Sequence, residues 1–205
     1  LYRLHRYQAW SLNAEEMIVS IEFIVSQDPE LLEQYYQLRQ ACFRKELGIP
    51  DFDGSEDESD RQSHILLAVK DGRCIGGARI SPNIPIEGRL PELADLEQEA
   101  CCMWERFVLD PAERTVQLFR DFCGHLIEYS ALIGYQYALV LSSLRNARFY
   151  RQYHSALGIG FQIHRAVLDC AQGAFTGLEH YLSVSNLQDV SAAALRECVP
   201  VRLAA

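Results

Sequence analysis

The chain has 205 residues, of which 49% are hydrophobic and 23% charged; this composition excludes a disordered protein and is sufficient for a substantial core. The formal net charge of −9 argues against a nucleic acid as the main partner, because no basic face is available to neutralise phosphates. The seven cysteines form no CxxC pair, which favours buried thiols in a reducing compartment over a disulfide framework. No apolar run approaches the ~20 residues that cross a bilayer, and no signal-peptide core begins the chain, so we expect a cytoplasmic protein without a membrane span.

The first half of the chain alternates between extended and helical patterns. Its expected elements are, in order, an aromatic and basic arm over 1–17, a half-buried strand over 18–25, a helix from Asp28-Pro29 to about Gly48, an acidic segment over 50–63, and strands over 65–69 and 74–80. Asp71-Gly72, between the last two strands, is a strong hairpin signal. The polar stretch 81–99 is long for a loop in a compact domain, and such loops are usually functional or mobile.

The stretch 103–161 predicts a strand–helix–strand–helix unit around which the other elements are organised. An apolar strand over 103–109 stops at Asp110-Pro111, because proline disfavours helical geometry at the residue before it. Apolar residues then recur at helical spacing from Val116 to Gly134, a natural helix stop. The remaining expected elements are a buried strand over 137–141, a helix over 146–157, strands over 162–169 and 180–185, and a last helix over 187–198.

Several short motifs occur in the order in which these elements follow one another. They are Leu38-Arg39-x-x-x-Phe43-x-x-Glu46-x-Gly48, Asp57-x-x-Asp60 followed by His64, Gly76-Gly77-Ala78-Arg79-Ile80, and Trp104-Glu105-Arg106-Phe107-Val108. With the element order, they resemble the GNAT (N-acetyltransferase) superfamily, and within it the acyl-homoserine lactone (autoinducer) synthases and bacterial N-acyl amino acid synthases, over roughly 18–181.

The resemblance implies a fold of the α/β (α+β) class. Its sheet would be mixed, mostly antiparallel and flanked by helices, with a central parallel strand pair that splays apart between Val108 and Leu139. We expect this GNAT-like acyltransferase domain to occupy 18–186, after an N-terminal arm over 1–17 and before a C-terminal helix and tail over 187–205.

The start of the central helix departs from the acetyltransferase pattern. Acetyl-CoA-binding members usually carry R/Q-x-x-G-x-G/A there, whose glycines let backbone amides approach the pyrophosphate. Here Arg114 is kept, but Gln117 and Phe119 replace the glycines. Autoinducer synthases also lack these glycines and take acyl chains from acyl carrier protein, which presents phosphopantetheine alone. The resemblance thus implies no tightly bound cofactor, acyl-CoA or acyl-phosphopantetheine as co-substrate, and acyl carrier protein as a candidate partner.

Two further departures separate the chain from the autoinducer synthases. Their central strand carries a glutamate and an arginine three residues apart, whereas Glu105 and Arg106 are adjacent here. Ile49-Pro50 also stands where those enzymes have a tryptophan after the first helix. Homoserine lactone production from S-adenosylmethionine is therefore not the favoured reaction.

Acyl transfer from a thioester assigns roles to the central strand. The carbonyl must be held, polarised and attacked by a neutral amine, and the thiolate must leave protonated. In this fold the pantetheine pairs with the strand edge. Its expected partners are the backbone groups of Phe107, Val108 and Leu109, with Arg114, Thr115 and Asn146 nearby. Glu105 is the candidate general base, and its alternative role is a structural ion pair with an arginine. Arg106 should point to the opposite sheet face unless a bulge intervenes.

Further candidates come from the same resemblance. Tyr150, in Asn146-Ala147-Arg148-Phe149-Tyr150, resembles the tyrosine that protonates the thiolate; Tyr153 is a rival, and a plain core role is the alternative. The residues that would line the acceptor pocket are Arg39, Phe43, Asp57, Asp60, Arg79 and Arg106. Alternatively, two arginines clamp an acidic linker to the sheet, since an arginine fork holds a carboxylate of protein or substrate alike. The histidines lack ligand spacing with Cys or Asp, so no metal site is expected.

Three functions remain open at this point. The first is an N-acyltransferase that moves an acyl group from acyl carrier protein or acyl-CoA to an amino acid or a similar small amine. The second is an acetyl-CoA-dependent N-acetyltransferase with a degenerate phosphate loop. The third is a catalytically inactive GNAT domain that binds an acyl ligand or a partner for regulation.

Overall fold

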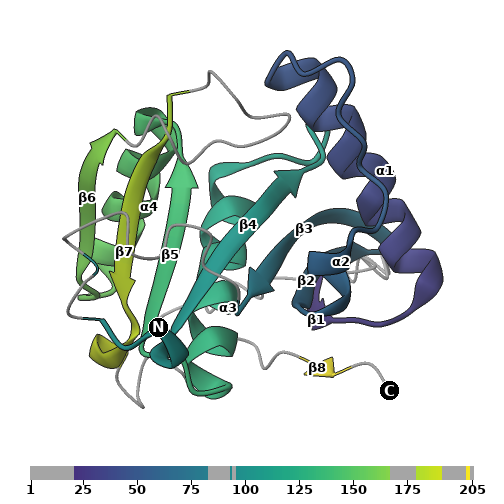
Figure 1. Cartoon of the computed structure of the whole chain (residues 1–205). Helices are drawn as coiled ribbons and strands as arrows, with labels where there is room; N and C mark the ends of the chain where they lie inside the picture. The colour runs from purple at the N-terminus through teal and green to yellow at the C-terminus, as the bar shows by residue number, and fades with distance from the viewer. Residues whose placement is uncertain (1–20, 83–92, 94–95, 167–178, 191–201, 204–205) are drawn as a thin grey trace, which may run out of the picture.

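The computed structural model describes residues 21–82, 93, 96–166, 179–190 and 202–203, which form a mixed sheet flanked by helices (Figure 1). Its strands are β1 (Ile21–Val25), β2 (His64–Lys70), β3 (Arg73–Ser81), β4 (Cys101–Leu109), β5 (Tyr137–Ser142), β6 (Phe161–Ala166), β7 (Tyr181–Asn186) and β8 (Arg202–Leu203). Its helices are α1 (Pro29–Glu46), α2 (Glu58–Arg61), α3 (Val116–Leu132) and α4 (Leu144–Ala156), and Gln98–Ala100 and Leu187–Asp189 form 3₁₀ turns.

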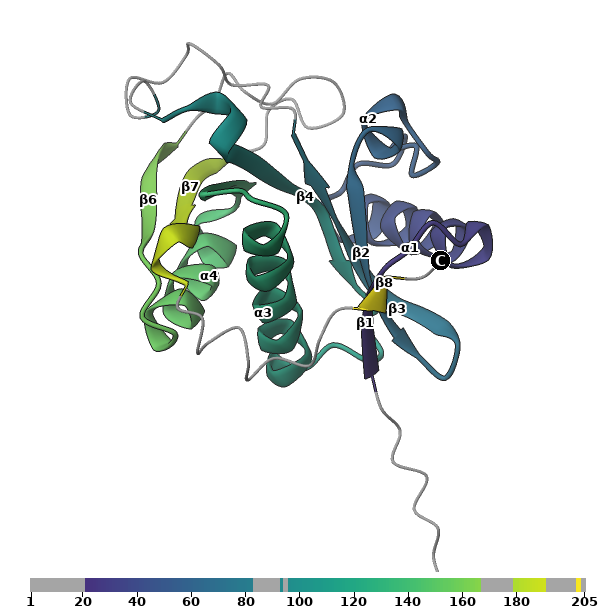
Figure 2. The same ribbon diagram turned by 90° about the horizontal axis from the view of Figure 1, so that it is seen from below.

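The sheet has the strand order β6-β7-β5-β4-β3-β2-β1-β8. Neighbouring strands are antiparallel except in the pairs β4–β5 and β1–β8, which are parallel. Seen from below, α3 and α4 cover one face, while α1 and α2 lie on the other (Figure 2). This arrangement confirms the expected fold class, a mostly antiparallel mixed sheet between helices.

Each sheet face carries an apolar core. The larger core lies against α3 and α4, and Trp104, Phe122 and Leu126 are among its buried side chains. The other lies under α1 and includes Tyr35 and Leu67, both completely buried. Burial of one such large apolar side chain contributes about 1.5–3 kcal/mol. These cores therefore fix the helices on the sheet and the polar groups that the helices carry.

Local sequence signals determine where the elements begin and end. Asp28 caps α1 by accepting a hydrogen bond from the Glu30 amide (2.8 Å), and Thr115 caps α3 by accepting one from the Leu118 amide (3.0 Å). Asp71 and Gly72 both have positive φ (51° and 74°), as a two-residue type I′ hairpin requires. The sequence-based predictions of both helices and of the hairpin are therefore confirmed.

The two central strands separate partway along their length. β4 and β5 pair only from Cys101 opposite Tyr137 to Trp104 opposite Val140. From Glu105 onward β4 pairs with β3 alone, and the two strands diverge in Figure 1. The expected splay between the strands of Val108 and Leu139 is thus confirmed, and it leaves an opened edge of β4 over 105–109.

A bulge in β4 lies within this opened edge. Arg79 pairs with Glu105 and Gly77 with Val108, so one residue of β3 lies opposite two residues of β4, Arg106 and Phe107. Arg106 has φ +54°, a left-handed conformation that a side chain normally avoids. The bulge changes the alternation of the strand and returns the Arg106 side chain to the face that Glu105 occupies.

Some expectations on element boundaries need correction. β4 begins at Cys101, two residues earlier than expected, and α4 begins at Leu144, because Ser143 caps it. The prediction of a helix that begins at Leu187 is wrong for its first turn. Leu187–Asp189 is a 3₁₀ turn, and the backbone is extended at Val190. The two residues of β8, expected in a tail, pair with β1. The arm over 1–17, most of the 81–99 loop, 167–169 and 191–198 lie outside the described residues.

In the part of the chain that the structure describes, no helix is both long enough and apolar enough to cross a membrane.

Candidate active site

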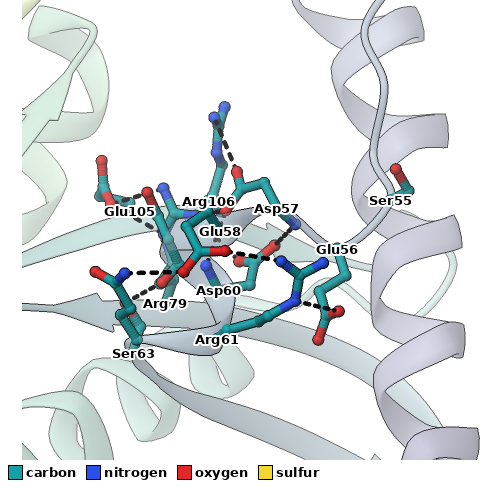
Figure 3. A network of polar contacts seen from close by, with 12 residues as sticks. Ser55, Glu56, Asp57, Glu58, Asp60, Arg61, Ser63, Arg79, Glu105 and Arg106 are labelled. Carbon is teal, nitrogen blue, oxygen red and sulfur yellow. Dashed lines mark hydrogen bonds and ion pairs between the residues drawn. The ribbon is translucent and has the colours of Figure 1, made fainter.

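A network of charged side chains lies on the α1/α2 face of the sheet, beside the bulge in β4 (Figure 3). Its innermost member is the pair Arg39–Asp60, whose side chains are 1% and 0% exposed. Two nitrogens of Arg39 donate to the two carboxylate oxygens of Asp60 at 2.9 Å. Arg39 also donates to the carbonyls of Gly54 (2.8 Å) and Ser55 (2.7 Å). This arginine therefore clamps the acidic linker to α1, which is the structural alternative considered for it.

The buried carboxylate of Asp60 is ionised in this setting. Burial by itself would raise its pKa, but the hydrogen bonds from Arg39 and from the Asp57 amide outweigh that effect and hold the pKa below its usual range. Asp57 and Asp60 also form a capping box for α2, because each side chain accepts the other's amide (2.8 and 2.9 Å). The short helix thereby places both aspartates toward the sheet.

The linker lies unusually close to α1. A side chain at Gly54 would bring a Cβ to 2.4 Å from Gln40 Cβ and 2.7 Å from the Tyr36 carbonyl, so only glycine fits there. The same approach lets the Gly54 carbonyl reach Arg39.

Arg79 connects this inner pair to the opened strand. Its Nη1 contacts Asp57 Oδ1 at 2.8 Å and Asp60 Oδ1 at 3.1 Å. On the other side its Nη2 contacts Glu105 Oε2 at 2.8 Å. The Arg79 side chain is only 4% exposed, so it is a buried centre of the network.

Three of the charged residues around Arg79 and the bulge remain accessible to solvent. The side chains of Asp57, Glu105 and Arg106 are 43%, 22% and 21% exposed. Arg106 Nη2 lies 3.9 Å from Asp57 Oδ2, and its guanidinium lies 5.2 Å from the ring centroid of Phe52. Adjacent residues of a regular strand point to opposite faces, so Glu105 and Arg106 can serve one site only if a bulge intervenes. The structure contains this bulge. The ring of Phe43 packs against that of Phe52, with 4.8 Å between the ring centroids, and so supports the ring on which Arg106 lies.

The polar groups of the opened edge can be assigned by alternation along β4. The Asp110 amide donates to the Ile75 carbonyl of β3 (2.8 Å). Because backbone groups alternate in direction along a strand, those of Val108 also face β3, whereas those of Phe107 and Leu109 face the opening. The Leu109 carbonyl accepts a hydrogen bond from Arg114 Nη2 (2.8 Å).

Tyr150 lies on the opposite face of the sheet from the charged network. Its ring packs against Phe107 (6.4 Å), Phe119 (5.4 Å) and Phe161 (6.1 Å), and it is 3% exposed. Burial raises the pKa of its hydroxyl well above the ordinary value, so this group keeps its proton at neutral pH. The contact with Phe107 places it near the opened part of β4.

Two further donor-side candidates lie on α4, Asn146 in its first turn and Tyr153 near its end. Asn146 is exposed, and its backbone N–H donates to Ser143 Oγ (3.3 Å). Tyr153 is half-buried, with the Arg120 guanidinium 5.8 Å from its ring centroid. The structure therefore brings Glu105, Arg106, Asp57, Asp60, Arg79 and Arg39 together, and it leaves Tyr150, Tyr153 and Asn146 on the other side of the sheet.

Two residues of this region were not singled out from the sequence. Phe52 has no recognisable signal, being an isolated aromatic residue in an acidic segment. Glu46 is part of the motif on α1, but only the structure shows that it pairs with Arg114. Ion pairs between segments that are distant in the chain leave no periodic pattern.

The resemblance of this chain to known proteins lies in its fold. No family model and no curated protein matches the sequence. Similar solved structures include the CoA-dependent acyl-homoserine lactone synthase BjaI with SAM and isopentyl-CoA, at 17% identity and a TM-score of 0.63 over 88% of this chain and 87% of that one. Another is the acyl-homoserine lactone synthase LasI, at 18% identity and a TM-score of 0.60 over 91% and 98% of the two chains.

A third similar structure is a proposed N-acetyltransferase from Lactobacillus plantarum. It is 19% identical, with a TM-score of 0.60, and covers 82% of this chain and 99% of its own. Likeness at such identities establishes architecture. The chain therefore has the GNAT fold, which N-acetyltransferases and acyl-homoserine lactone synthases share.

Proposed function

We propose that the chain is an N-acyltransferase that moves an acyl group from a thioester, on acyl carrier protein or CoA, to the amine of an amino acid or a related small molecule. One observation carries this proposal. An opened strand edge, which can pair with a pantetheine arm, borders directly on solvent-accessible carboxylates and a guanidinium at the bulge.

The accessible charges fit a zwitterionic acceptor. Asp57 and Glu105 offer carboxylates to an ammonium group, and Arg106 offers a guanidinium to a carboxylate. Arg39 and Asp60 are buried and hold each other, so they position this surface without reaching a substrate. An α-amino acid carries both complementary charges on one carbon, which makes it the acceptor class that we infer.

The donor would pair with the opened edge of β4. A pantetheine amide matches the backbone groups of Phe107 and the backbone N–H of Leu109, in the manner of a peptide that adds to a sheet, while the Leu109 carbonyl is bonded to Arg114. The acyl carbonyl then lies at the bulge, between Glu105 on one face and Tyr150 on the other. The two candidates need not touch each other, because the amine and the sulfur lie on different sides of the reacting carbon.

The transfer balances with these groups. The amine nitrogen attacks the thioester carbon, a C–N bond forms and the C–S bond breaks. The bound ammonium first releases one proton to solvent, which leaves the neutral amine that attacks. As the C–N bond forms, the nitrogen loses its second proton to Glu105, directly or through one water, and the departing thiolate takes the proton of the Tyr150 hydroxyl. The high pKa of Tyr150 ensures that this proton is present.

Helix α4 offers a surface that suits a carrier-protein donor. Arg145, Arg148 and Arg151 are exposed on it, and the helix contains no acidic residue although the chain has a net charge of −9. A surface hollow of about 350 Å³ lies beside two of these arginines, lined by Leu144, Arg145, Arg148, Phe149 and Gln152. An acidic carrier protein would find complementary charge there.

The test is a reaction of the purified chain with matched acyl groups on carrier protein and on CoA, in the presence of a panel of amino acids. Mass spectrometry should detect an N-acyl amino acid. Acetylated amines formed only from acetyl-CoA would instead support an N-acetyltransferase. Binding of donors without any product would support an inactive, ligand-binding domain.

A further inference from the structure

An ion pair ties the end of α1 to the loop between β4 and α3. Arg114 Nη1 and Nη2 bind the two carboxylate oxygens of Glu46 at 2.9 and 2.8 Å. Nη2 also donates to the carbonyl of Leu109, the last residue of the opened edge. The hydrogen bonds from Arg114 hold the pKa of Glu46 below its usual range, so the carboxylate is ionised at neutral pH.

The loop around this pair is electrically balanced. Arg73 binds Asp110 (2.7 Å) and Glu113 (3.0 Å), and Lys70 binds Glu113 (2.7 Å). With Glu46 and Arg114, the group contains as many carboxylates as cations, each paired within the group. The Leu118 amide at the start of α3 is already bonded to Thr115. A phosphate that approaches this loop would therefore meet compensated charge.

We propose that Glu46 determines donor specificity by occupying Arg114. The Nη1–Nη2 edge of a guanidinium binds one carboxylate or one phosphate bidentately at a time, and Nη2 of Arg114 is in addition bonded to the Leu109 carbonyl. Glu46 and a donor phosphate therefore compete for this edge of Arg114. While Glu46 occupies the Arg114 guanidinium, a donor is recognised through its pantetheine arm on β4, and the phosphates of a nucleotide add little to its affinity. This inference rests on the proposed acyltransferase function and assigns the donor class of that site.

Direct binding measurements separate the contribution of the pantetheine arm to donor affinity from that of the phosphates. Isothermal titration calorimetry would compare pantetheine, which has no phosphate, with CoA, for the wild-type chain and for Glu46→Gln. Glu46 is 38% exposed, so this change should leave folding intact, and a thermal melt verifies that. We expect Glu46→Gln to tighten CoA about five- to tenfold and to leave pantetheine unchanged.

Glu113→Gln is the matched control. It removes the same charge from the same region but leaves the Glu46–Arg114 pair in place. It should tighten CoA by less than about twofold, because only general electrostatic attraction changes. In the double variant Glu46→Gln/Arg114→Gln, the gain in CoA affinity should disappear.

The outcomes are distinct. Equal tightening of CoA by Glu46→Gln and Glu113→Gln, equal tightening of pantetheine and CoA, or no change in either would overturn the role of Glu46. A wild-type chain that binds neither pantetheine nor CoA, and that turns over no thioester, would overturn the proposed function and with it this inference. Binding of both probes without an effect of Glu46→Gln would overturn the inference alone.

Discussion

Arg79 and Glu105 are joined twice: they are opposite each other in the β3–β4 ladder, and Arg79 Nη2 lies 2.8 Å from Glu105 Oε2. Arg79 Nε contacts the same oxygen at 2.9 Å, so Oε1 is not part of this contact. The pair therefore orients the carboxylate while one of its oxygens lies outside the contact. The structural role and the catalytic role considered for Glu105 are compatible in this geometry, and mutation is needed to separate them.

The buried pair Arg39–Asp60 should control stability. Asp60→Asn leaves Arg39 and Arg79 buried beside a neutral amide, and we expect unfolding in urea to show a loss of about 3–5 kcal/mol. Arg61→Gln, which removes only exposed ion pairs with Glu56 and Glu58, should change stability by less than about 1 kcal/mol. Equal effects of the two variants would contradict the central position of Asp60.

His154 should make stability depend on pH. It is completely buried, its Nδ1 lies 2.7 Å from the Tyr150 carbonyl, and burial lowers its pKa from 6.5 to about 4. The unfolded chain therefore takes up this proton below pH 6.5 and the folded chain only near pH 4, so stability falls as the pH drops between these values.

The full loss from this group, reached below pH 4, is about 3.5 kcal/mol at a conversion of ~1.4 kcal/mol per pKa unit. The difference in unfolding free energy between the wild-type chain and His154→Leu should shift by about 2.5 kcal/mol from pH 7 to pH 4.5. A pH-independent difference would show that His154 takes up its proton in the folded state as readily as in the unfolded state.

The left-handed backbone of Arg106 gives a prediction with an unusual sign. Arg106→Ala and Arg106→Gly remove the same guanidinium, and both should raise the KM for an amino-acid acceptor by at least about tenfold. Glycine normally destabilises a strand relative to alanine, but φ +54° favours it here. We expect Arg106→Gly to be more stable than Arg106→Ala by about 1 kcal/mol in chemical unfolding; the reverse order would contradict the bulge.

Tyr150 tests the donor side. Tyr150→Phe keeps the aromatic packing against Phe107, Phe119 and Phe161 but removes the hydroxyl proton. If that proton protonates the thiolate, kcat should fall about 10²- to 10⁴-fold while the melting temperature changes little. Unchanged kcat in Tyr150→Phe, together with a loss in Tyr153→Phe, would transfer the role to Tyr153.

The sequence was sufficient for those features that depend on local chemistry. Asp28 and Thr115 cap their helices, Asp71-Gly72 forms the hairpin, and the strand–helix–strand unit predicts the opening between β4 and β5. For the caps and the hairpin, one or two neighbouring residues determine the backbone conformation, whereas the opening follows from the order of the elements.

Other features depend on contacts that sequence spacing does not reveal. The bulge follows from the register between β3 and β4, and it reverses the direction expected for Arg106 from simple alternation. The pairing of Glu46 with Arg114 joins residues 68 positions apart. A 3₁₀ turn forms at Leu187–Asp189, where a helix over 187–198 was expected. The Asn186 side chain caps this turn by accepting the Gln188 amide, and the backbone is extended at Val190, so a capping residue alone did not reveal where the helical backbone ends.

The central claim is that acyl transfer takes place at the bulge of β4, with Glu105 as the base. Its most direct measurement is kcat/KM for Glu105→Gln with the thioester and amino acid that give product, alongside a thermal melt of the same preparation. Glutamine keeps the size of the side chain and a hydrogen-bonding oxygen for Arg79 but cannot take the proton. The account predicts a fall of about 10²- to 10⁴-fold in kcat/KM with little change in melting temperature. A lower melting temperature with near-normal turnover of the folded protein would contradict it and leave Glu105 as the structural partner of Arg79.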